Sequence, residues 1–171
     1  MGIVSGTFTL YIGQTPLGVL DNKLFAFLVP PIRAHEWTIT PVPQHGENAV
    51  IIQTADLAEG LLLPADDPGT QVAVRPLIAG RSHPPTYPPD EVWVVTPLAE
   101  DDALDLAPDA AAFTLRSQSV GDDQFIGRNE IEDLSMRPKP IVLRPPQAEP
   151  APFIAIPVTE AAENPQSNDP K

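Results

Sequence analysis

Short runs in which apolar and polar residues alternate recur along the whole chain, and this period of two is typical of β-strands. Proline makes up 23 of the 171 residues and interrupts the chain between the runs, while 42% of the residues are hydrophobic, enough for a core. The pattern therefore predicts an all-β protein of about eleven short strands. We expect them at residues 7–12, 18–29, 37–42, 49–54, 60–64, 71–78, 93–98, 112–116, 124–128, 140–145 and 153–158.

Three of these runs share one pattern, in which an aromatic residue is followed by three strand-compatible residues, a proline and an aliphatic residue. The runs begin at Trp37, Trp93 and Phe153, so they lie 56 and 60 residues apart. Near-equal spacing of a repeated string indicates a threefold architecture. Because the three aromatic residues take equivalent strand positions, we expect them in the core rather than at a ligand-stacking site.

The repeat divides the chain into three units of about four strands each, at residues 6–42, 49–98 and 112–158. Three such units in one closed domain predict a β-trefoil over residues 1–158, with a generic β-sandwich as the alternative. The segment 99–111 is rich in Asp and Ala, which is typical of a solvated linker. Residues 159–171 hold too few apolar side chains to order themselves, so we expect a disordered acidic tail.

The charge and the residue inventory exclude several kinds of partner. A formal net charge of −13 and an isoelectric point near 4.3 argue against nucleic acid and anionic membranes as partners. The chain has no cysteine, so it forms no disulfide and does no thiol chemistry. Residues 1–6 lack the basic region and apolar stretch of a secretory signal, and no apolar run is long enough for a membrane span. We expect a monomeric cytoplasmic protein.

Catalysis finds no support in the chain. The three histidines, His35, His45 and His83, stand beside predicted turns and outside any metal-ligand spacing. No Gly-rich phosphate loop or nucleophile elbow is present. Ser82 precedes His83 directly, but an activated serine needs a base aimed at it by a third group, so a turn pair is the better interpretation. We expect no enzymatic activity, no metal and no cofactor.

The stretch from Gln71 to Val95 holds the clearest functional signal: a strand, a proline-stiffened loop and a second strand. Two Pro-Pro pairs lie between Ser82 and Pro89, and proline fixes its own φ and restricts the residue before it. A stiff, exposed loop held between two strands suits insertion into the cleft of another protein. Arg81, flanked by Gly80, Ser82 and His83, would be its most prominent side chain.

Four strings resemble the fungal β-trefoil serine protease inhibitors of mushrooms, of the cospin and cnispin type. They are Gln44–Ala49, Gln71–Ile78, Ser82–Glu91 and the stretch from Ile126 to Lys139. The resemblance covers about residues 6–98 and 112–158. In the family, the part similar to 112–158 opens the chain, so the resemblance implies a circular permutation in which 99–111 joins the usual termini. Permutation is best tolerated where termini lie close together.

The resemblance implies a reversible, substrate-like inhibitor whose loop places one anchor side chain in the primary pocket of a serine protease. In some members a basic residue in the loop corresponding to 79–89 is inhibitory. This favours Arg81 as the first candidate anchor, since an arginine pairs with the carboxylate of a trypsin-like pocket. The alternative is an ordinary surface arginine.

The loop 129–139 is the second candidate, with Asp133, Leu134, Ser135, Met136 and Arg137. Other members carry a basic anchor where this chain has Leu134, so either Leu134 or Met136 would instead suit an apolar, chymotrypsin-like pocket. Arg137 precedes Pro138, which is a poor residue after a scissile bond. We expect the Leu134 side chain to pack under the loop, which leaves Arg81 as the favoured anchor.

Three rival functions stay open at this point. A carbohydrate-binding trefoil of the ricin type carries a Gln-x-Trp string in each unit, and this chain has none. A trefoil that has lost its inhibitory activity is the second rival. The third is a cysteine protease inhibitor, a function of related mushroom trefoils that use other loops.

Overall fold

The computed structural model describes residues 5–29, 35–98, 110–129 and 132–158. Within them the chain forms twelve strands and two short 3-10 helices, neither of which could cross a membrane. The strands are β1 (Gly6–Ile12), β2 (Thr15–Leu20), β3 (Lys23–Ala26), β4 (Trp37–Pro41), β5 (Ala49–Thr54), β6 (Gly60–Leu62), β7 (Ala73–Arg75), β8 (Trp93–Pro97), β9 (Ala111–Ser117), β10 (Ile126–Arg128), β11 (Lys139–Leu143) and β12 (Phe153–Pro157). The helices are η1 (Pro43–His45) and η2 (Pro89–Glu91).

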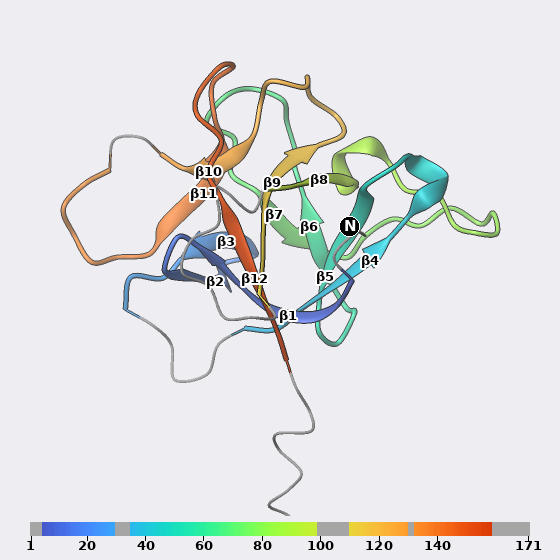
Figure 1. Cartoon of the computed structure of the whole chain (residues 1–171), viewed down its shortest axis with the longest axis horizontal. Coiled ribbons are helices and arrows are strands. Elements are labelled where there is room, and N and C mark those ends of the chain that lie inside the picture. Colours follow the sequence, from blue (N-terminus) through green and yellow to red (C-terminus); the bar gives the residue numbers. More distant parts are fainter. Residues whose placement is uncertain (1–4, 30–34, 99–109, 130–131, 159–171) are drawn as a thin grey trace, which may run out of the picture.

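Six of the strands form a closed antiparallel barrel (Figure 1). Going around it, β1 pairs with β4, β4 with β5, β5 with β8, β8 with β9, and β9 with β12. The pairing of β12 with β1 closes the ring, so these strands leave no open sheet edge. The prediction of an all-β fold is confirmed.

The register of the barrel repeats three times. The twelve strands fall into three sets of four in chain order, β1–β4, β5–β8 and β9–β12. Within each set the first and last strands pair, and the paired residues are Phe8 with Trp37, Val50 with Trp93, and Phe113 with Phe153. Between consecutive sets they are Trp37 with Thr54, Trp93 with Ser117, and Phe153 with Ile12. Equal registers give the three aromatic residues equivalent places, and the fold is trefoil-like.

The other six strands form three hairpins, β2–β3, β6–β7 and β10–β11, that cap the barrel. β3 pairs with both β7 and β11, and a single bridge joins Gln71 to Val142. Each hairpin is therefore linked to the other two. Both candidate loops are connected to these capping hairpins: the loop 79–89 follows β7, and the loop 129–139 joins β10 to β11. Each loop therefore begins at a strand that is paired within the cap.

The prediction of a single strand at 18–29 is wrong, because the chain reverses at Asp21 and Asn22. Both residues have positive φ values, 54° and 61°, as in the tight turns whose twist suits a two-strand hairpin. The run contributes to β2 and β3, which explains twelve strands instead of about eleven. The predicted run 71–78 also shortens, to β7, since Pro76 has no N–H for a ladder.

Trp37, Trp93 and Phe153 are all buried in the barrel core, as predicted. The Trp93 indole Nε1 donates a hydrogen bond to the Leu61 carbonyl at 3.1 Å, which satisfies its one polar atom inside the core. Phe153 stacks on Phe113 with a centroid distance of 6.3 Å. These positions serve packing rather than ligand binding.

Two sequence predictions fall largely outside the described residues. Of the predicted linker, 99–109 lie outside them, and β9 already begins at Ala111. The predicted tail, 159–171, lies outside them entirely.

Candidate functional site

Two exposed loops leave the barrel at opposite ends of the horizontal axis of Figure 1. The Arg81 loop, residues 79–89, follows β7 and is the yellow-green loop on the right. The Leu134 loop, residues 129–139, joins β10 to β11 and is the orange loop on the left; residues 130–131 lie outside the described part. The candidate residues thus form two separate groups, Gly80–His83 and Asp133–Arg137.

The Arg81 loop closes on itself at its base. The Gly80 N–H donates to the Thr86 carbonyl at 2.7 Å, and the Ser82 hydroxyl donates to the Pro84 carbonyl at 2.9 Å. A Cβ on Gly80 would lie 2.9 Å from Oγ1 and 3.3 Å from the carbonyl oxygen of Thr86, so the close approach favours glycine. Arg81, Ser82 and His83 are exposed at the loop's end, as the sequence predicts for a binding loop.

The helix η1 braces the same loop from the side. The Gln44 amide donates to the Pro85 carbonyl at 2.6 Å, and His45 Nε2 accepts the Tyr87 N–H at 2.9 Å. The Gln118 amide in turn donates to the His45 carbonyl at 2.9 Å. Sequence reasoning treated His45 as an ordinary surface histidine and missed this contact. The string Gln44–Ala49, which resembles the family, was the available signal.

Glu91 anchors the base of the Arg81 loop. Its buried carboxylate accepts the Ile78 N–H, with both oxygens 3.0 Å from that nitrogen. Burial raises the pKa of Glu91, the hydrogen bond from Ile78 opposes the rise, and the nearby charge of Asp90 adds to it. Beside it, Leu77 and Tyr87 pack on a small apolar cluster made of Val42, Ala49, Ile51 and Val92.

Replacing Glu91 by glutamine is expected to make the free energy of unfolding less dependent on pH. A raised pKa in the folded state means that the ionised carboxylate opposes folding, so wild-type stability falls as the pH rises above about 4.5. Glu91→Gln keeps an oxygen acceptor for Ile78 and removes that loss. Urea unfolding between about pH 4 and pH 8 measures the difference, with the exposed Glu47→Gln as control. Parallel pH curves for wild type and Glu91→Gln would contradict the prediction.

The Leu134 loop is held by a network centred on one carboxylate oxygen. Asp133 Oδ1 accepts the Ser135 N–H at 3.0 Å, the Ser135 hydroxyl at 2.6 Å and the Lys139 ammonium at 2.5 Å. The hydrogen bond from Lys139, with those from Ser135, lowers the pKa of Asp133 far below its ordinary value. Lys139 itself is 4% exposed and also donates to the Asp133 carbonyl at 3.2 Å. A buried cation thus fixes the two residues that flank Leu134.

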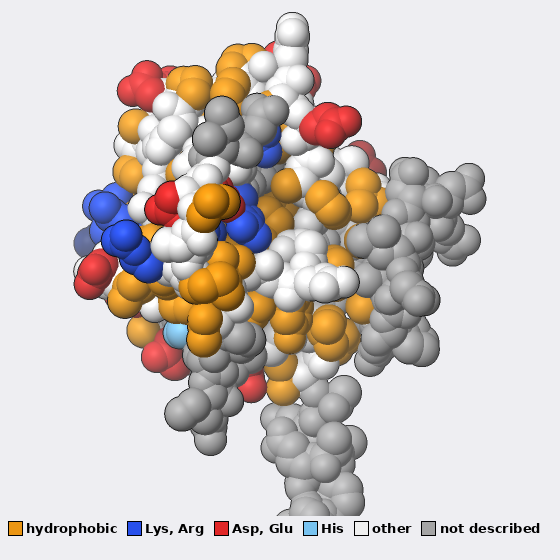
Figure 2. Space-filling view, turned by 90° about the vertical axis from the view of Figure 1, so that its left-hand side faces the viewer, with side chains coloured by type: hydrophobic (Ala, Val, Ile, Leu, Met, Phe, Trp, Pro, Cys, Tyr) orange, Lys and Arg blue, Asp and Glu red, His pale blue; other side chains and the backbone are white. Residues whose placement is uncertain are grey.

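Leu134 does not pack under the loop, so that expectation is wrong. Its side chain is 99% exposed, and Met136 is 63% exposed. The inner side of the loop is occupied by the Asp133, Ser135 and Lys139 contacts, and Leu134 points outward between its two pinned neighbours. Figure 2 looks at the end that carries this loop, where hydrophobic side chains protrude among basic ones.

Around the Leu134 loop, two further arginines have distinct places. Arg128, at the end of β10, binds Glu132 through two hydrogen bonds, Nε to Oε2 at 3.0 Å and Nη2 to Oε1 at 2.5 Å. This pair links the end of β10 to Glu132, the first described residue after 130–131. Arg137 is exposed, and its N–H donates to Ser135 Oγ at 3.3 Å.

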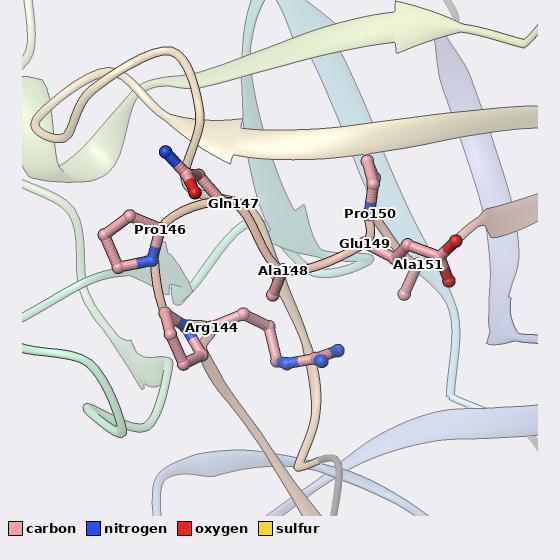
Figure 3. Close-up of a pocket in the computed structure, with 8 residues that line it drawn as sticks. Arg144, Pro146, Gln147, Ala148, Glu149, Pro150 and Ala151 are labelled. Atoms are coloured by element: carbon pink, nitrogen blue, oxygen red, sulfur yellow. The ribbon is translucent and has the colours of Figure 1, made fainter.

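The structure also has an open hollow of about 710 Å³, lined by residues 144–151 alone (Figure 3). The Arg144 side chain extends beneath Ala148, and its Nε has no hydrogen-bond partner among the described residues. No group of three His, Cys, Asp or Glu side chains in the described part could hold a metal ion. The hollow belongs to neither loop, and nothing in its lining indicates a catalytic centre.

The described residues thus form a closed β-barrel with two exposed loops whose bases are held by hydrogen bonds. Residues 3–97 match the family described as peptidase inhibitor I66. The chain belongs to this family of inhibitors, which is not a family of enzymes.

Individual relatives are similar over part of their length. A protein of Lentinula edodes described as a serine protease inhibitor is 39% identical over 83 residues, 48% of this chain and 57% of that protein. The chain thus matches only a little over half of this relative. A proteinase inhibitor structure from Coprinopsis cinerea is 26% identical, covers 53% of this chain and 96% of its own, and has a TM-score of 0.44. A mosquitocidal holotoxin shares the fold over 92% of this chain and 18% of its own, at a TM-score of 0.60 and 8% identity.

Proposed function

We propose that the protein is a reversible, substrate-like inhibitor of serine proteases and that the Leu134 loop is its inhibitory loop. One observation carries the proposal: Leu134 is 99% exposed while Asp133 and Ser135, on either side of it, are pinned by the buried Lys139. A single exposed anchor on a preorganised loop gains binding energy with little ordering cost. Membership of the peptidase inhibitor family and the serine protease inhibitor of Lentinula edodes support the same function.

The chemistry of the anchor sets the class of protease. Leucine has no positive charge to pair with the carboxylate of a trypsin-like pocket. Its apolar side chain fits the hydrophobic pocket of a chymotrypsin-like enzyme. The loop binds as a substrate would, with Leu134 in that pocket. If the enzyme cuts after Leu134, the Lys139 contacts to Asp133 and Ser135 hold both sides of the cut in place, which favours resynthesis over release.

Inhibition assays on the purified protein test this function. We expect chymotrypsin to be inhibited at nanomolar to micromolar concentrations, and subtilisin, whose pocket also accepts apolar side chains, to be inhibited too. Papain, a cysteine protease, should keep full activity. Full activity of chymotrypsin and subtilisin at micromolar inhibitor would contradict the proposal, and inhibition of papain alone would transfer it to cysteine proteases.

We also propose that the chain is a circular permutant within its family. The family match ends at residue 97, the last residue of β8, and the strings at 126–139 that resemble the opening part of the family follow it. The pairing of β12 with β1 is compatible with this order, since a closed ring can be opened between any two sets of strands. Alignment of residues 112–158 alone tests it: they should match the first third of the family's proteins and not the last.

A further inference from the structure

We propose that Met136 is a reversible oxidation site, at which a peroxide lowers the affinity of the Leu134 loop for its protease. This inference rests on the proposed inhibitory function and adds a means of regulation to the same loop. It is carried by the position of Met136, two residues after Leu134 and exposed like it, in a chain that has no cysteine.

Met136 lies on the face of the loop that carries the anchor. Leu134 is 99% exposed and Met136 is 63% exposed. Ser135, between them, turns its hydroxyl inward, where it donates to Asp133 Oδ1 at 2.6 Å. This alternation is that of an extended chain, in which residues two apart share a side. A protease–inhibitor interface covers about 800 Å² of each partner, far more than one side chain, so a protease that accepts Leu134 also covers Met136.

The Met136 side chain is the readily oxidised group that the described residues expose. The chain has no cysteine, and its other methionine, Met1, lies outside the described residues. Both tryptophans, Trp37 and Trp93, are fully buried. A methionine sulfur that solvent reaches is oxidised by peroxides to the sulfoxide, and reductases specific for each sulfoxide epimer reverse the reaction. Peroxide should therefore modify Met136 before any residue of the core.

The modification is a two-electron oxygen transfer from a hydroperoxide. A sulfur lone pair attacks one peroxide oxygen, so that an S–O bond forms while the O–O bond breaks. The departing hydroxide takes the proton of the transferred oxygen. Hydrogen peroxide is thereby reduced to water, and the thioether is oxidised to the sulfoxide. The product carries a polar oxygen on a side chain that was apolar before.

Oxidation should change the face of the loop and not its shape. The contacts that hold the described part of the loop run between Asp133, Ser135 and Lys139, and the Met136 side chain takes no part in them. A protease that covers the sulfoxide must remove water from its oxygen, for which an apolar contact surface offers no partner. Burying an unpaired polar group in this way weakens binding about 10-fold to 100-fold.

Inhibition assays before and after oxidation test the proposal. The purified protein is incubated with excess hydrogen peroxide, the peroxide is removed by gel filtration, and chymotrypsin is added only then. Peptide mass spectrometry gives the fraction of Met136 that carries an added oxygen. For the fully oxidised protein we expect an inhibition constant about 10-fold to 100-fold higher and an unchanged melting temperature. Treatment with the reductases for both sulfoxide epimers should restore inhibition.

Three variants assign the effect to position 136. Met136→Leu keeps Met1 but lacks the exposed thioether, so its inhibition constant should be the same before and after peroxide. Met136→Gln places a polar amide at this position and should weaken inhibition without any oxidant. The matched control, Leu57→Met/Met136→Leu, moves the thioether to the exposed turn between β5 and β6. Oxidation of that sulfur should be visible by mass spectrometry and leave the inhibition constant unchanged.

The outcomes separate this inference from the function on which it rests. If the untreated protein inhibits chymotrypsin and the oxidised protein inhibits it equally, the regulation is wrong and the inhibitory function stands. Resistance of Met136 to peroxide, an equal loss of inhibition in Met136→Leu, or a fall in melting temperature parallel to the loss also overturns the assignment. If the untreated protein inhibits neither chymotrypsin nor subtilisin, the proposed function fails, and the inference fails with it.

Discussion

Replacement of Leu134 by alanine is expected to weaken inhibition of chymotrypsin about 30-fold to 1000-fold, because a buried anchor at the centre of an interface typically contributes about 2–4 kcal/mol. The stability of the folded protein should hardly change. Leu134 is 99% exposed and contacts no core residue, so the melting temperature should stay within the error of the measurement. Inhibition constants together with thermal unfolding of the same samples measure both effects.

Leu57 provides the matched control for this experiment. It lies in Asp56-Leu57-Ala58, where the Asp56 carboxylate accepts the Ala58 N–H at 3.0 Å, as the Asp133 carboxylate accepts the Ser135 N–H. Leu57 is 56% exposed, but its φ of 64° is left-handed, which is not the extended geometry of a bound substrate. Leu57→Ala should therefore inhibit as wild type does. Equal losses in both variants, or none in Leu134→Ala, would remove Leu134 as the anchor.

Introducing a positive charge at the same position gives a second test. Leu134→Arg should gain inhibition of trypsin at the Leu134 loop and lose that of chymotrypsin, because the loop's geometry is fixed by other residues. To exclude the Arg81 loop from the measurement, the variant is compared with the double variant Arg81→Ala/Leu134→Arg.

The architecture was largely predictable from the sequence because equivalent strands of the three units have similar sequences. The alignment of the runs at Trp37, Trp93 and Phe153 corresponds to the equal registers seen in the barrel. Alternation of apolar residues gave the strands, since one face of each is buried. The alternation failed at Asp21–Asn22, where two polar residues in left-handed geometry form a turn within an otherwise strand-like run.

The candidate loops were found as exposed segments, but what holds them was not. Their braces are contacts between residues distant in sequence, such as His45 with Tyr87 and Gln44 with Pro85, and periodicity carries no information about such pairs. Lys139 is the sharpest case. A lysine is rarely buried without a partner. That rule, applied to Lys139 at the start of a strand and six residues after Asp133, would have indicated that the lysine has a carboxylate partner.

Removal of the Lys139 charge should weaken chymotrypsin inhibition about 10-fold to 100-fold without lowering stability. Lys139→Met keeps the volume in the buried position and breaks three contacts, to Asp133 Oδ1, the Asp133 carbonyl and Ser135 Oγ. Replacing a buried ion by an apolar side chain is often neutral or stabilising, so the melting temperature should be unchanged or higher. The loop loses part of its preorganisation, because the two bonds between Asp133 and Ser135 remain. Restoring the lost order costs on the order of 1.4–2.8 kcal/mol at binding.

Removing Asp133, the other member of the ion pair with Lys139, separates loop order from stability. Asp133→Ala removes the oxygen that binds Lys139 and Ser135 and leaves the Lys139 ammonium buried without its carboxylate, so this variant should melt at a lower temperature while losing inhibition to a similar extent. Both variants should also be cut after Leu134 faster than wild type, as followed by mass spectrometry during incubation with active chymotrypsin. Lys23→Met, at an exposed lysine in the neighbouring strand β3, controls for the loss of a positive charge. Matching losses of inhibition with opposite changes in melting temperature would separate preorganisation of the loop from stability of the fold, whereas wild-type inhibition by Lys139→Met would show that the buried lysine does not hold the loop for binding.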